Sequence, residues 1–199
     1  MVYIITSLLE SPQPVMTHNK KADEESEENK DNDDTSDLEK AFDSKIDMRI
    51  ENFWAAVDAL GIKNKEHIGY GIDLAKKLQK ALVDTASSLI NNKRVKPSSK
   101  FRYVIIENDD LLETKMFQYP LAIQKLALFL MEAYKEIRGV TENMPVVISV
   151  KNSARDSYLV AGVLGQNSAI TGTKNEFGNC FASVAEEIGA NFKQNGFET

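Results

Sequence analysis

The side chains best suited to chemistry stand where an apolar run ends. Glu107, Asp109 and Asp110 follow the run at residues 101–106, and Lys115 comes a few positions later. Carboxylates of this kind are ligands for Mg²⁺, and sheet folds often place their sites at strand ends. Any metal-assisted reaction of this chain would have to use this group.

The other catalytic side chains are too few or too scattered to form a site. Of the two histidines, His18 lies in an acidic stretch and His67 near a predicted helix start; the single cysteine is Cys180. A structural zinc needs clustered ligands, and a serine or cysteine nucleophile usually needs a histidine base. The glycines match neither a phosphate-binding loop nor a dinucleotide fingerprint. We expect no catalytic residues, no metal site and no cofactor.

The charge of the chain is concentrated in one segment. Residues 17–37 carry nine acids against three lysines, a charge of −6 that equals the formal net charge of the whole chain. The segment has no aromatic and no aliphatic side chain larger than that of alanine, so it cannot bury enough surface to fold. We predict a disordered acidic tail over residues 17–36 and a neutral body, which disfavours nucleic acid as a partner.

A basic loop is the most polarised part of that body. Asparagine, proline and serine mark residues 91–102 as a connector, which carries five positive charges between Lys93 and Arg102. Two other side chains are candidate contacts: Trp54 flanks a predicted apolar stripe, and Leu128 projects from the polar side of a predicted helix. These two side chains and the five cations of the basic loop form the predicted partner-binding set, which consists of Trp54, Leu128, Lys93, Arg94, Lys96, Lys100 and Arg102.

The first sixteen residues allow two interpretations. Residues 1–9 are apolar but lack the basic start and the cleavage site of a signal peptide. They form either an edge strand or, if Met16 is the true start, an annotation artefact, which is the interpretation we favour.

A single cysteine excludes an internal disulfide and fits a reducing compartment, and no apolar run is long enough for a membrane span. We therefore expect a cytoplasmic protein.

Hydrophobic periodicity predicts seven elements after the tail. A capping box at Ser36 begins a helix whose core stripe would run from Leu38 through Ile50, Phe53 and Val57 to Leu60. The elements are a helix, a helix, a strand, a helix, two strands and a helix, over residues 36–60, 67–91, 101–107, 120–138, 145–150, 157–164 and 176–194.

This order predicts an α+β fold. An N-terminal helical hairpin and two further helices would pack on a small mixed sheet, in the order ααβαββα. We assign one domain to residues 37–199, preceded by the acidic tail at residues 17–36 and the uncertain segment at residues 1–16.

The favoured function is a non-catalytic cytoplasmic adaptor whose partner is another protein. Its composition is similar to that of small acidic secretion chaperones and adaptors. One alternative is a magnesium-dependent, nuclease-like enzyme that uses Glu107, Asp109, Asp110 and Lys115. A further alternative is an immunity or antitoxin-type protein acting through its acidic arm. The sequence identifies neither the partner nor the oligomeric state.

Overall fold

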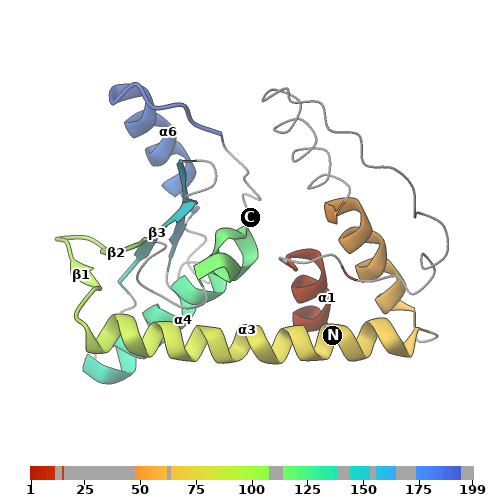
Figure 1. Ribbon diagram of the computed structural model, residues 1–199. Helices are drawn as coiled ribbons and strands as arrows, with labels where there is room; N and C mark the ends of the chain where they lie inside the picture. The colour runs from red at the N-terminus through yellow and green to blue at the C-terminus, as the bar shows by residue number, and fades with distance from the viewer. Residues whose placement is uncertain are drawn as a thin grey trace, which may run out of the picture. The chain divides into compact units, whose positions relative to one another are not determined.

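The described residues form two compact units (Figure 1). The computed structural model describes residues 1–11, 15, 48–61, 64–107, 114–138, 144–152, 156–164 and 174–193. Unit 1 is Met1–Gln79 and unit 2 is Lys80–Thr199, and helix α3 (Lys65–Asn91) supplies residues to both. None of the described helices has the length and apolar character needed to cross a membrane.

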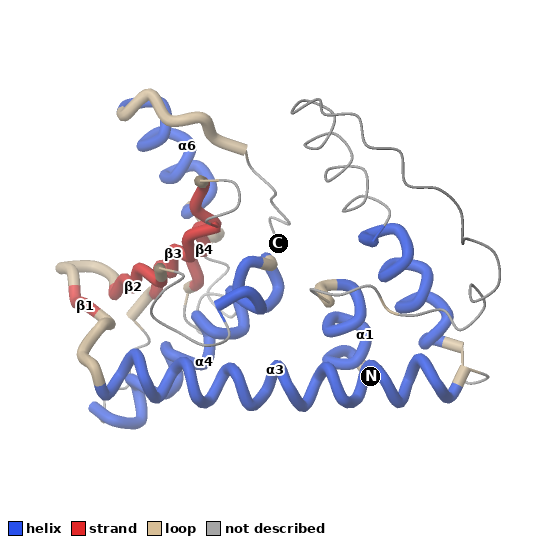
Figure 2. Tube along the Cα trace, in the orientation of Figure 1, coloured by secondary structure: helices blue, strands red, loops and turns tan. Residues whose placement is uncertain are grey.

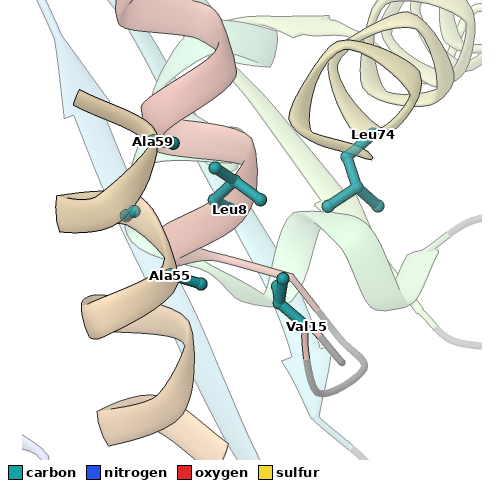
Figure 3. Packing of buried hydrophobic residues seen from close by; sticks show 6 residues of the cluster. Leu8, Val15, Ala55, Ala59 and Leu74 are labelled. Carbon is teal, nitrogen blue, oxygen red and sulfur yellow. The ribbon is translucent and has the colours of Figure 1, made fainter. Parts of the chain in front are cut away.

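Unit 1 is helical. Helix α1 (Val2–Leu9), a helix described over residues 48–60 and the first part of α3 enclose a small apolar core. Figure 3 shows Leu8 of α1 facing Ala55 and Ala59 of helix 48–60 and lying near Leu74 of α3. The buried cluster consists of Leu8, Val15, Ala55, Ala56, Ala59 and Leu74.

Small side chains set how closely these helices approach. A Cβ atom added at Gly71 of α3 would lie 2.5 Å from Cγ2 of Ile4 and 3.1 Å from Cδ1 of Leu8. Distances under 3 Å are shorter than any normal carbon contact, so α1 can lie this close to α3 only because residue 71 has no side chain. Ala55 and Ala59 play the same part on helix 48–60, where they are 1% and 0% exposed.

A buried amide ties the chain after α1 to helix 48–60. The Asn52 side chain accepts a hydrogen bond from the Val15 backbone N–H at 3.1 Å and donates one to the Ser11 carbonyl at 3.1 Å. Asn52 is 1% exposed, so these bonds satisfy groups that water cannot reach. They tie Ser11 and Val15 to a helix some forty positions away in the sequence.

Unit 1 differs from the sequence prediction at two places. Residues 2–9 form a helix rather than an edge strand, and Leu8 and Val15 are core residues; which methionine starts the chain stays an open prediction. The predicted core stripe of helix 36–60 is exposed at Ile50, Phe53, Val57 and Leu60. The predicted start of that helix and the acidic tail lie outside the described residues.

Unit 2 contains a four-stranded mixed sheet (Figure 2). Its strands are β1 (Lys96–Pro97), β2 (Arg102–Ile106), β3 (Val146–Asn152) and β4 (Ser157–Val163), in that spatial order. β2 pairs with β3 in parallel, and β1 and β4 pair with their neighbours antiparallel. The register sets Val104 beside Ile148 and Ile106 beside Val150, and all four are buried.

Two helices and a short turn complete unit 2. Helix α4 (Pro120–Arg138) follows the 3₁₀ turn η1 (Thr114–Gln118) and contacts β3 and β4 through a face that includes the buried Ile123, Leu126 and Leu130. Helix α6 (Phe177–Glu187) contacts β4. A Cβ at Gly162 of β4 would lie 2.4 Å from Cγ of Phe177, so the phenylalanine ring packs directly on the strand backbone.

The predicted α+β class is confirmed, with a mixed four-stranded sheet. Helix α4 has the predicted bounds, and α3 ends at the predicted residue, Asn91. The sequence missed α1, β1 and η1, and it extended the last helix to residue 194, whereas α6 ends at Glu187. The assignment of one domain to residues 37–199 stays a prediction, and contacts within the chain group it into the units Met1–Gln79 and Lys80–Thr199.

Replacing Asn52 with alanine should destabilise unit 1 by about 2–3 kcal/mol, because it removes two buried hydrogen bonds of the Asn52 side chain, one from the Val15 N–H and one to the Ser11 carbonyl. Urea unfolding followed by fluorescence of Trp54, the chain's one tryptophan, measures this directly. Asn92→Ala is the control, since Asn92 is exposed and its side chain donates to Ser88 Oγ one turn earlier at the same helix end. Equal midpoints for the two variants would contradict the role assigned to Asn52.

Replacing Gly162 with alanine should destabilise unit 2 by about 1–3 kcal/mol, because the new Cβ overlaps the ring of Phe177. Gly69→Ala is the matched control: a Cβ there meets no atom within 4 Å, and alanine in a helix should stabilise by about 1 kcal/mol. Thermal unfolding of both variants gives the comparison. The Gly162→Ala penalty should shrink in a Phe177→Ala background, and full additivity of the two changes would refute the contact.

Candidate partner-binding surfaces

The outer face of helix 48–60 is an exposed apolar surface of unit 1. Phe53 and Trp54 are 50% and 59% exposed, and their rings meet edge to face with centroids 5.4 Å apart. We call this surface the outer face; its members are Ile50, Phe53, Trp54, Val57 and Leu60. The sequence predicted Trp54 either at the edge of a core stripe or as an interface anchor. In the structure it lies in the middle of the exposed apolar outer face.

The orientation of this helix follows from side-chain size. Asn52, Ala55, Ala56 and Ala59 occupy the side that packs on α1 and the core, and each is at most 2% exposed. Bulky residues on that side would hold α1 further away, so they occupy the opposite side. The sequence contained this signal as a second stripe of small residues at positions 52, 55, 56 and 59, which periodicity of large residues alone does not detect.

The basic loop begins at an ordered helix end. The Lys93 N–H bonds to the Ile90 carbonyl and the Arg94 N–H to the Leu89 carbonyl, at 3.1 and 2.9 Å, which is the Schellman pattern. Lys93 takes the left-handed position of this motif with φ 53°. Positive side chains at a helix C-terminus also complement the helix dipole. Part of the basic charge therefore serves to end α3.

The rest of the loop is a β-hairpin rather than the irregular connector predicted. β1 pairs with β2, and the turn is closed by a hydrogen bond from the Ser98 N–H to the Phe101 carbonyl at 2.8 Å. Val95, 7% exposed, anchors the hairpin. Lys96 and Lys100 project from it as exposed cations. We call residues 93–102 the basic hairpin.

Arg102 differs from the other cations of the basic hairpin. It is half-buried, its backbone N–H bonds to the Pro145 carbonyl at 2.8 Å, and its guanidinium lies 5.1 Å from the ring centre of Tyr134. This cation–π contact links β2 to α4. Arg102 thus has a structural task, and the exposed charge of the hairpin comes from the lysines and Arg94.

Leu128 lies on α4 beside a second exposed apolar residue. It is 38% exposed and Phe129 is 40% exposed. These two side chains are a smaller surface than the outer face of unit 1.

The carboxylate group is only partly described. Glu107 is exposed directly after β2, and Lys115 is exposed on η1, while Asp109 and Asp110 lie outside the described residues. Cys180 is an exposed free thiol on α6. Within the part of the chain that the structure describes, no three His, Cys, Asp or Glu side chains gather closely enough to hold a metal ion.

Sequence comparison places the chain in a family. The CDC45 family matches residues 1–199, and the chain belongs to it. Three relatives are cell division control protein 45 from Saccharomyces cerevisiae and its homologues from Dictyostelium discoideum and Schizosaccharomyces pombe, at 27%, 35% and 30% identity. The matches cover 75%, 72% and 64% of this chain but only 24%, 22% and 21% of the relatives. The chain thus spans less than a quarter of the length of these relatives.

Family membership corrects the functional expectations. The relatives are named for control of cell division, so the adaptor of the secretion-chaperone type is wrong, and neither the nuclease-like nor the antitoxin-type alternative finds support. The expected cytoplasmic location and the exclusion of nucleic acid are wrong as well. The location rested on the single cysteine and the lack of a membrane-spanning run, and the exclusion of nucleic acid rested on the neutral charge of the body. Membership of a family of cell division control proteins contradicts both expectations.

The absence of catalysis has partial support. The names of the relatives state a role in cell division and no reaction.

Proposed function

We propose that this chain acts in the initiation of DNA replication, as a segment of a Cdc45-type factor that works by binding and not by catalysis. The observation that carries the proposal is the family match over residues 1–199, together with 35% identity to the Dictyostelium relative. The proposed location is the nucleus, and the proposed partners are proteins and nucleic acid of the replication machinery.

The surfaces of both units support a binding role. Unit 1 exposes the outer face around Trp54, and unit 2 exposes the lysines of the basic hairpin and the pair Leu128 and Phe129. Apolar and basic side chains of this kind contribute to protein and phosphate contacts. We propose that the predicted partner-binding set works in these contacts, with Arg102 supporting the hairpin from within.

The replication role predicts that the chain can replace its counterpart in a living cell. In Dictyostelium discoideum depleted of its own protein, the relative should support DNA synthesis when its 145 matched residues are exchanged for this chain. The measurement is nucleotide-analogue incorporation in S phase. The control chimera carries Leu8→Asp, which inserts a charge at a fully buried core position and should fail. A chimera that accumulates in the nucleus yet restores no DNA synthesis would contradict the proposal.

The basic hairpin predicts salt-sensitive binding to phosphates. Replacing Lys96 and Lys100 with glutamine should weaken binding to an oligonucleotide and reduce the slope of log K against log salt by about 2, one unit for each lost phosphate contact. Fluorescence anisotropy at several salt concentrations measures both quantities. Lys76→Gln with Lys77→Gln is the control, since these exposed lysines lie on α3 outside the hairpin. Equal slopes for the two double variants would exclude the hairpin as the contact.

A further inference from the structure

The outer face of helix 48–60 is an apolar surface with nothing described packed on it. Its side chains follow positions i, i+3, i+4, i+7 and i+10, which place them along one side of the helix. All are large, and their exposed fractions run from 38% at Val57 to 59% at Trp54. The charged residues of this helix, Arg49, Glu51 and Asp58, flank the face and do not interrupt it.

A helix that is apolar on two opposite sides is typical of a buried helix. The inner side of helix 48–60 is closed by α1 and the core of unit 1, where Ala55, Ala56 and Ala59 are at most 2% exposed. The outer side carries the larger side chains, although surface helices normally turn polar residues to solvent. Five bulky residues along three turns match the anchors by which one helix fills an apolar groove. The helix is therefore built to lie between two layers, of which unit 1 supplies one.

The character of the face indicates what covers it. Permanent interfaces resemble a domain core cut in half, whereas exchangeable partners meet surfaces with more polar and charged groups. The outer face is uncharged in its centre and therefore belongs to the permanent kind. The relatives contain a large amount of polypeptide that could cover it, because the matched regions make up only 22%, 24% and 21% of their lengths.

We propose that the outer face is the docking site for polypeptide from the part of a Cdc45-type protein that lies outside the region spanned by this chain. The occupant contributes an apolar groove that takes Trp54 and Phe53 as its central anchors. The proposal rests on family membership and on the exposed side chains, and it holds whether or not the replication role is correct.

The single tryptophan gives a direct test. In the isolated chain, labelled with 5-fluorotryptophan, one ¹⁹F resonance reports on Trp54. The same chain is then placed in the full-length Dictyostelium relative in exchange for the 145 matched residues, and a Trp54→Phe version identifies the resonance. Accessibility is measured as relaxation by a soluble gadolinium chelate. We expect the relaxation enhancement at Trp54 to fall about fivefold or more in the full-length protein, because the core of an interface excludes water.

A matched pair of variants tests the contact itself. Ile50→Ser alters the outer face, and Val83→Ser alters α3, and the two residues are 50% and 47% exposed. Ile50→Ser should restore severalfold relaxation at Trp54 in the full-length protein, while Val83→Ser should leave the protection unchanged. Neither variant should alter unfolding of the isolated chain by more than about 0.5 kcal/mol, because both side chains are exposed there.

Each other outcome overturns the proposal. Equal accessibility of Trp54 in the isolated chain and in the full-length protein would show that no polypeptide of the relative covers the face. Protection that appears in the isolated chain as its concentration rises would assign the face to a second copy. Should the chimera not fold, co-expression of this chain with the relative lacking its matched residues allows the same ¹⁹F measurement with the same criteria.

Discussion

The parallel pairing of β2 with β3 is the constraint on which unit 2 depends. Two parallel neighbours cannot be joined by a tight turn, so the chain must cross from the end of one strand to the start of the next, and α4 lies in that connection. The crossover brings the apolar side of α4 onto the sheet, where the buried Val104, Ile148 and Val150 alternate with residues of the other face. The antiparallel strands β1 and β4 then add at the two sides. The β2–β3 pairing also fixes the conformation of the basic hairpin, because β2 is one of the two strands of that hairpin.

Unit 1 depends on a different constraint, the absence of side-chain volume between its helices. Gly71 lets α1 approach α3, and Ala55 and Ala59 let it approach helix 48–60. Because only small side chains fit between α1 and helix 48–60, the large side chains of this helix lie on its outer side. An exposed Trp54 is thus the consequence of a closely packed interior, and it leaves this unit with a surface that needs a further layer.

Function could not be obtained from single motifs in this chain. Few histidines, one cysteine and ordinary glycines directed the interpretation away from a recognisable catalytic site. The choice among binding proteins then rested on charge, and charge misled. The acidic segment at residues 17–37 and the neutral remainder favoured a cytoplasmic adaptor, whereas the family match is spread over the whole chain. Such a match accumulates over the length of the chain and does not depend on one motif.

The sequence by itself determined the type and extent of most elements. Pro120 and the periodicity after it predicted both ends of α4 to the residue. The β-rich runs predicted every end of β2, β3 and β4 to within two positions. These signals are reliable because they depend on local backbone geometry. Only the tertiary structure decided which side of helix 48–60 faces the core, that residues 2–9 form a helix, and that Arg102 stacks on Tyr134. Those outcomes depend on volume and contacts between residues far apart in the chain. Trp54 shows both contributions. The sequence indicated its place beside an apolar stripe, and the packing of the helix against α1 decided that this stripe lies at the surface.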